Sequence, residues 1–176
     1  MRNIELKARL PDLAAARATA EKLATKRLGT QHQIDTYFDC RHGRLKLRQI
    51  DGLRAELIWY DRPDLKGPKT SNYRLVPVSN PVTLKNALAA ALGVLQVVEK
   101  RREIFLFHNV RIHLDQVAGL GEFIEFEAVV GQEADEAVSH ARLDELVTAF
   151  AIAPADKLAR SYGEMLDKPA GLTGGR

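Results

Sequence analysis

The sequence contains several short segments in which apolar and charged residues alternate. Residues 3–10 read Asn-Ile-Glu-Leu-Lys-Ala-Arg-Leu, and residues 44–48 read Arg-Leu-Lys-Leu-Arg. Successive side chains on a β-strand point to opposite faces, so each segment predicts a strand with one apolar and one charged face. Residues 54–62 and 123–127 show a related pattern. A chain built from such segments must form a sheet that buries one face and hydrates the other.

The remaining segments predict further strands joined by short turns, together with three or four helices. Short connections favour antiparallel pairing of successive strands. We expect Gly29 to end the first, alanine-rich helix. The predicted strands are 3–10, 34–39, 44–48, 54–62, 71–78, 96–107, 110–115 and 123–127, and the predicted helices are 12–28, 81–92, 133–150 and 157–166.

The charges on the strand faces are segregated by sign. Residues 44–48 carry three cations, and Lys100 with Arg102 form a second basic row, whereas Glu125 and Glu127 form an acidic row. A sheet with one face in water is the simpler alternative, but it predicts mixed charges in compensating pairs. We therefore infer a curled or closed sheet with helices outside and a wet, ionised interior, which requires a charged ligand.

The acidic row follows a turn at residues 119–121, where two glycines supply conformational freedom. Glu125 and Glu127 share one face of their strand, and their repulsion is relieved by a cation or by water. Hard cations such as Mg²⁺ take oxygen ligands, commonly a few carboxylates with substrate phosphates. The alternative is that these acids are ordinary solvated surface residues.

Size and composition indicate one globular domain, which we place at residues 1–168, with a flexible tail at residues 169–176. The net charge of +3 is mild and its cations are spread along the chain, which argues against nucleic-acid binding. The single cysteine, Cys40, excludes an internal disulfide and a cysteine-based zinc site. No apolar run approaches a membrane span and the N-terminus is unlike a signal peptide, so we expect a cytoplasmic protein without membrane contact.

The ordered motifs resemble the CYTH family, also called triphosphate tunnel metalloenzymes, over almost the whole chain. The family's opening Glu-x-Glu-x-Lys signature is matched by Asn3-Ile-Glu5-Leu-Lys7. The other matching motifs are Gln33-Ile-Asp-Thr-Tyr-Phe-Asp39, Arg44-Leu-Lys46-Leu-Arg48, Leu57-Ile-Trp-Tyr-Asp-Arg62-Pro, Lys69-Thr-Ser71-Asn-Tyr73, Lys100-Arg-Arg102, Arg111-Ile-His-Leu-Asp115 and the Gly-Leu-Gly-x-Phe-x-Glu-x-Glu segment. The second motif and the last look most like the class IV adenylate cyclase branch.

This resemblance implies an α+β fold, a closed eight-stranded antiparallel β-barrel that forms a tunnel with helices packed outside. It implies Mg²⁺ or Mn²⁺ as cofactor and a triphosphate as substrate, and it makes a homodimer plausible. Glu5 and Lys7 would be catalytic. The implied metal ligands are Glu5, Asp115, Glu125 and Glu127, and the implied phosphate-binding residues are Lys7, Lys46, Arg48, Arg62, Lys100 and Arg102.

Four positions carry alternatives. Arg62 is either a phosphate-binding residue or a surface cation that precedes a loop. Asn3 replaces the first glutamate of the family signature, and its neutral amide oxygen ligates Mg²⁺ more weakly than a carboxylate. Glu122 is interpreted as a solvated turn residue, with an extra metal ligand as the alternative. His113 is either a hydrogen-bonded interior histidine or a proton carrier.

The resemblance leaves three functions open. The first is an adenylate cyclase that converts ATP to cyclic AMP and pyrophosphate. The second is a triphosphatase that hydrolyses inorganic triphosphate, thiamine triphosphate or a nucleoside triphosphate. The third is a polyphosphate- or nucleotide-binding module that has lost catalysis through Asn3.

Overall fold

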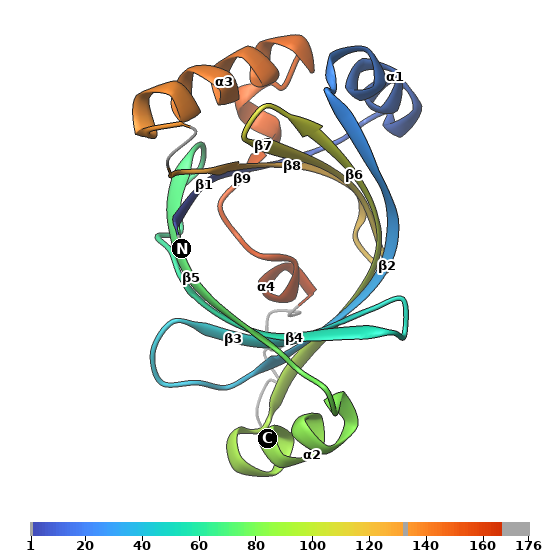
Figure 1. The fold of residues 1–176 in the computed structure, drawn as a ribbon, viewed down its shortest axis with the longest axis vertical. Coiled ribbons are helices and arrows are strands. Elements are labelled where there is room, and N and C mark those ends of the chain that lie inside the picture. Colours follow the sequence, from blue (N-terminus) through green and yellow to red (C-terminus); the bar gives the residue numbers. More distant parts are fainter. Residues whose placement is uncertain (1, 132–133, 167–176) are drawn as a thin grey trace, which may run out of the picture.

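In the computed structural model, which describes residues 2–131 and 134–166, a single antiparallel sheet curls into a closed ring (Figure 1). Eight strands follow the order β5-β4-β3-β2-β6-β7-β8-β1, and pairing of β1 with β5 closes the barrel. The strands are β1 (Arg2–Arg9), β2 (Lys26–Phe38), β3 (Arg44–Ile50), β4 (Arg54–Asp61), β5 (Lys69–Pro77), β6 (Val94–Phe107), β7 (Val110–Val117), β8 (Gly121–Val129) and the short β9 (Lys157–Leu158). The expected closed eight-stranded barrel is confirmed, and β9 adds to it by pairing with β1.

Helices cover the barrel on two opposite sides (Figure 1). They are α1 (Leu13–Leu23) and α3 (Glu136–Ala149) on one side and α2 (Pro81–Leu92) on the other. A fourth helix, α4 (Tyr162–Leu166), follows a 3₁₀ turn at Pro154–Asp156. α1 and α3 contact β1 and β6–β8, whereas α2 contacts β2 and β3. None of the helices among the described residues is long and apolar enough to span a membrane.

The main hydrophobic core lies between the sheet and helices α1 and α3. The outward side chains of β1 and β7, such as Ile4 and Ile112, pack there against Leu143 and Leu146 of α3. Burying these apolar faces outside the barrel turns the charged faces of the same strands inward. The alternation that marks the strands in the sequence therefore also decides what the tunnel contains.

Two predicted helices are wrong in part. The first was expected to reach residue 28, but α1 ends at Leu23, because Thr25 already donates its backbone N–H to Leu106 and β2 then pairs with β6 from Lys26 to Phe38. Ladder hydrogen bonds along this length outweigh a weak local helix preference. The second was expected at residues 157–166, but its first part is the extended strand β9. The predicted tail at 169–176 lies outside the described residues.

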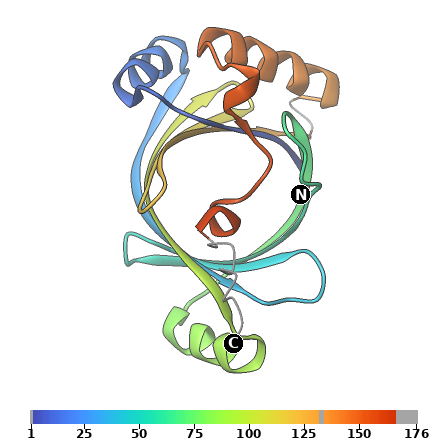
Figure 2. The ribbon, with the colours of Figure 1, turned by 180° about the vertical axis from the view of Figure 1, so that it is seen from behind.

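The fourth helix has a position that the sequence did not predict. α4 lies at the centre of the ring in both views along the barrel (Figures 1 and 2). A small apolar cluster, with Tyr162 of α4 against Tyr37, Val98, Val117 and Phe123, fills this end. One mouth of the tunnel is therefore covered by the chain's own C-terminal segment.

We expect Leu143→Ala to lower the free energy of unfolding by roughly 2–5 kcal/mol, because it leaves a cavity in a fully buried site under α3. The matched control Leu53→Ala, at a hairpin tip with 88% of the residue exposed, should change it by less than about 0.5 kcal/mol. Urea denaturation of both variants measures the difference. Equal effects would contradict this placement of the core.

Candidate active site

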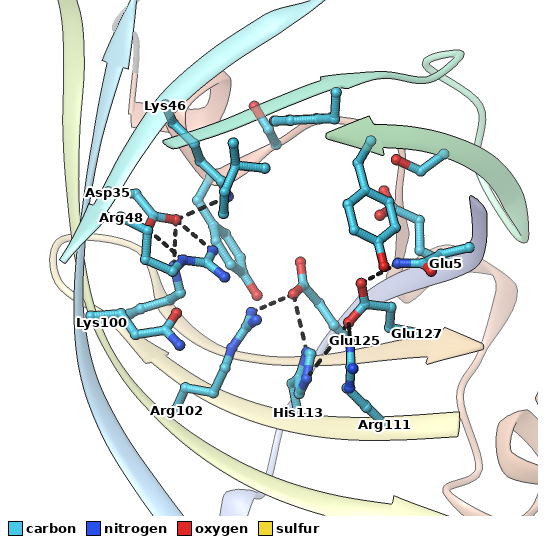
Figure 3. A pocket seen from close by; sticks show the side chains of 18 of the residues that line it. Glu5, Asp35, Lys46, Arg48, Lys100, Arg102, Arg111, His113, Glu125 and Glu127 are labelled. Atoms are coloured by element: carbon cyan, nitrogen blue, oxygen red, sulfur yellow. Dashed lines mark hydrogen bonds and ion pairs between the residues drawn. The ribbon is translucent and has the colours of Figure 1, made fainter. Parts of the chain in front are cut away.

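A cavity of about 470 Å³ occupies the barrel interior and takes side chains from all eight strands of the ring. Most of the side chains that line its middle are ionisable (Figure 3). They include Glu5 and Lys7 of β1, Asp35 of β2, Lys46 and Arg48 of β3, Lys100 and Arg102 of β6, Arg111 and His113 of β7, and Glu125 and Glu127 of β8.

Asp35 is the centre of one charged cluster, which lies on the β2, β3 and β6 side of the tunnel (Figure 3). Its fully buried carboxylate accepts two hydrogen bonds from Arg48, at 2.7 and 2.8 Å. It also accepts from Lys100 at 2.8 Å and from Lys46 at 3.1 Å. Burial alone would raise the pKa of Asp35, but Arg48, Lys100 and Lys46 together hold it well below its usual range. One carboxylate thus faces three cations.

The surroundings of Lys100 and Lys46 disfavour the protonated, positively charged forms of both side chains. Burial, with repulsion from Arg48, Arg102 and Lys46, lowers the pKa of Lys100 to about 7 despite its bond to Asp35. Burial and repulsion from Arg48 lower the pKa of Lys46 to about 8. The excess positive charge indicates a site that is completed by an anion.

A second cluster is centred on Glu125 of β8. This carboxylate lies 2.7 Å from Lys7 Nζ, accepts a short hydrogen bond from Arg102, and has His113 Nδ1 at 3.8 Å. Burial lowers the pKa of His113, and so does Arg102, although Glu125 and Glu127 work in the opposite direction. The imidazole is therefore favoured in its neutral form at the tunnel wall.

Three carboxylates line the wall formed by β1 and β8. Glu5 lies directly opposite Glu127 in the strand register, and Glu125 is next to Glu127 on the same strand face. Burial raises the pKa of Glu5, with Glu125 and Glu127 adding to this effect and Arg62, at 3.0 Å, reducing it. Glu5 therefore holds its proton more tightly than an ordinary glutamate, and a cation bound beside it would favour its ionised form.

The donor set of this wall fits a hard divalent cation that is shared with a substrate. In the described part of the chain no three His, Cys, Asp or Glu side chains are gathered into a preformed metal site. Asn3 donates from Nδ2 to Glu127, and its buried Oδ1 has no partner. Mg²⁺ is usually held by one or two carboxylates together with substrate phosphates, so Glu5 and Glu127 with this free amide oxygen suit it.

Asp115, predicted to be a metal ligand, occupies a different position. It is fully buried and absent from the cavity lining, and Arg102 binds it through two hydrogen bonds of 2.7 and 2.5 Å. Tyr162 donates to the same carboxylate at 2.7 Å. Arg102 lies between Asp115 and Glu125, so its contact with Asp115 orients its guanidinium group toward the tunnel.

Cationic side chains of the barrel contact the C-terminal segment that covers one end of the tunnel. Lys7 Nζ lies 3.4 Å from the centre of the Tyr162 ring. Arg62 donates to the backbone carbonyl of Ala159 at 3.1 Å, and Lys69 donates to the same carbonyl at 3.0 Å. At the rim, Arg44 bonds Glu164 at 2.7 Å, and this contact contributes to a Glu164 pKa of about 2 despite partial burial. Cations of the barrel therefore hold α4 across the mouth.

The structure places all six predicted phosphate-binding cations inside the barrel, with Arg62 shared between Glu5 and the C-terminal segment. Sequence reasoning missed Asp35, although an ionisable residue in the apolar context Ile34-Asp35-Thr36 was a signal for a paired buried charge. It also missed Tyr162, for which the sequence offers no local signal. Glu122 lies outside the cavity lining and accepts from Gln116 at 3.3 Å, as a turn residue would.

Solved structures share this fold. A Pyrococcus horikoshii protein is 22% identical with a TM-score of 0.81, covering 92% of this chain and 98% of its own. A Vibrio parahaemolyticus protein, provisionally described as an adenylate cyclase, is 24% identical with a TM-score of 0.78 and coverages of 94% and 98%. A Hippeastrum protein, also provisionally described as an adenylyl cyclase and reported to have a dominant triphosphatase activity, is 16% identical with a TM-score of 0.63 and coverages of 90% and 91%.

A search of the curated proteins finds no match. The family model that matches is that of the CYTH domain, over residues 1–162. With nearly the whole described chain inside that match, and with a closed barrel whose interior is charged, this chain belongs to the CYTH domain family.

Proposed function

We propose that this protein is a divalent-metal-dependent enzyme that binds a triphosphate inside the tunnel, with adenylate cyclase activity as the first candidate. The observation that carries the proposal is the excess of buried cations. Three cations share the single carboxylate of Asp35, and burial together with repulsion from neighbouring cations lowers the pKa of Lys100 to about 7 and that of Lys46 to about 8. A polyanion would relieve this repulsion, and a triphosphate carries several charges along one short chain.

In this proposal, cations on two sides of the tunnel bind the phosphate chain between them. Arg48, Lys46 and Lys100 bind phosphate oxygens on one side, where the planar guanidinium suits two oxygens at once. Arg102, oriented by Asp115, and Lys7 face the same space from the other side. Neutralising the phosphate charge and fixing the position of the chain are the main contributions a protein makes to phosphoryl transfer.

The acidic wall would hold Mg²⁺ or Mn²⁺. Glu5 and Glu127 are the proposed ligands, with Glu125 released from Lys7 as the phosphate takes over that cation. When bound, the metal neutralises phosphate charge and supplies a Lewis acid. In this proposal the neutral His113, 3.8 Å from Glu125 and 4.0 Å from Glu127, would accept a proton from the attacking hydroxyl.

Hydrolysis of the triphosphate is the second candidate. The similar Hippeastrum protein, with its dominant triphosphatase activity, is the observation in its favour. The two reactions need the same charges and differ in the nucleophile. A ribose 3′-hydroxyl attacks the α-phosphorus in cyclisation and displaces pyrophosphate, whereas water attacks the terminal phosphorus in hydrolysis and releases orthophosphate.

Identification of products tests the proposal. The purified protein is incubated with ATP, thiamine triphosphate and inorganic triphosphate, each with Mg²⁺ or Mn²⁺. Cyclic AMP with pyrophosphate is expected for the cyclase and orthophosphate for the hydrolase. Binding without turnover would leave a binding module, and in that case Asn3→Glu, which restores the family's first carboxylate, should produce turnover.

Removal of one acid from the wall should weaken metal dependence. Glu127→Gln keeps the side-chain shape but removes the charge, so we expect the Mg²⁺ concentration for half-maximal activity to rise by at least about tenfold. Glu122→Gln, outside the cavity, is the matched control and should behave as the wild type. An unchanged metal dependence in Glu127→Gln would remove this residue from the metal site.

Triphosphate affinity should fall as the pH rises through about 7 and then about 8, the pKa values of Lys100 and Lys46. Below these values both lysines are charged in the free protein, whereas above them each must gain a proton when the phosphate binds, and this lowers the affinity by about tenfold per pH unit for each lysine. Lys46→Arg, whose guanidinium stays charged, should lose the fall centred near pH 8 and keep the one near pH 7. Calorimetric titration with tripolyphosphate measures both curves, and superimposable curves would contradict the assignment.

A further inference from the structure

The end of the tunnel away from α4 carries a different set of side chains from the middle. Along the inward face of β2, Tyr37 packs near Gly163 at the covered end, Asp35 lies in the charged middle, and Gln33 and Gln31 follow. With a rise of about 3.3 Å per residue, Gln33 lies roughly 13 Å from Tyr37 along the strand, and Gln31 farther still. The two neutral amides therefore border the charged middle, with Lys100 opposite Gln33 and Arg102 opposite Gln31 on β6.

One atom of this amide pair is buried without a partner. Gln33 donates from Nε2 to Gln31 Oε1 at 2.7 Å, which uses one end of its side chain. Its other polar atom, Oε1, is buried and accepts no hydrogen bond, and the residue is only 2% exposed. A buried acceptor with no partner costs free energy, so its presence beside a cavity points to a donor that arrives from outside.

Apolar side chains flank the two amides, and the charged Arg54 of β4 lines the cavity opposite Ile50. Ile50 of β3 lies directly opposite Gln33 in the register, and Ile104 of β6 lies two residues beyond the partner of Gln31. Both isoleucines line the cavity and are almost fully buried, and Leu28 lines it nearby and is half exposed. A flat ring fits between such residues, with its faces on the aliphatic groups and its polar edge toward the amides.

We infer that this amide pair recognises the organic ring of a triphosphate ester, specifically a ring with an amino group beside an unprotonated ring nitrogen, as in adenine. The amino group would donate to Gln33 Oε1, and the free amide nitrogen of Gln31 would donate to the ring nitrogen. Gln33 is two residues from Asp35 on the same strand face, so a ring held here leaves its phosphates among the cations. This inference rests on the proposed triphosphate function and narrows it to amino-bearing organic triphosphates.

Inosine triphosphate is the matched ligand for the test. It shares the ribose and phosphates of ATP, but it has a carbonyl in place of the amino group and a protonated ring nitrogen, so both hydrogen bonds are reversed. We expect ATP to bind the wild-type protein about tenfold more tightly than inosine triphosphate, measured by calorimetry without divalent metal to prevent turnover. Thiamine triphosphate, whose pyrimidine carries the same edge, distinguishes a nucleotide from a thiamine ester as the source of the ring.

Gln33→Leu is the test variant and Gln49→Leu the control, because Gln49 lies outside the cavity lining on the neighbouring strand β3. In Gln33→Leu the preference for ATP over inosine triphosphate should disappear, while the affinity for tripolyphosphate stays within about twofold and shows that the barrel is folded. Gln49→Leu should keep the preference.

Three outcomes would overturn the inference. These are equal binding of ATP and inosine triphosphate by the wild type, an unchanged ATP preference in Gln33→Leu, and an equal loss of ATP and tripolyphosphate binding in that variant. Binding of tripolyphosphate with no preference among the nucleotides would reject this inference and leave the proposed function standing. Failure of all these ligands to bind would reject both.

Discussion

The interaction on which the rest of this structure depends is the contact of Asp35 with Arg48, Lys100 and Lys46. Buried charge is tolerated only where it is paired and hydrogen-bonded, and here a single carboxylate from β2 satisfies cations from both neighbouring strands. Without this acid the middle of the barrel would hold like charges at close range. Asp35 compensates part of the positive charge of Arg48, Lys100 and Lys46, which allows the barrel to close. The positive charge that is left over attracts an anion.

The second charged cluster follows a similar rule from the opposite wall. Glu125 is shared by Lys7 and Arg102, and Arg102 is shared in turn with the buried Asp115. A ligand can therefore replace Glu125 as the partner of Lys7 and Arg102, whereas Asp115, outside the cavity lining, keeps its hydrogen bonds from Arg102. In the proposed function, the internal ion pairs of the tunnel would exchange partners as phosphate and metal bind.

The features that the sequence predicts are those that local patterns carry. Alternation within residues 3–10 and 44–48 predicts strands, and the segregation of charge by sign predicts a shared interior. The length of β2 was missed because residues 26–33 lack clear alternation and because Leu28 continues the apolar spacing of the preceding helix. Asp35 and Asp115 acquire their partners through strand register, which brings together residues far apart in the chain and is not encoded in any one segment.

The position of α4 has a consequence for the order in which molecules move. Because residues 157–166 cover one mouth, a triphosphate bound as proposed would enter and leave through the other, past the amides of Gln33 and Gln31. In a tunnel that is open at one end only, the most deeply bound fragment is the last to leave. If a bound triphosphate is cleaved as proposed, the fragment nearest the opening would have to leave first, so the architecture would set the order of product release.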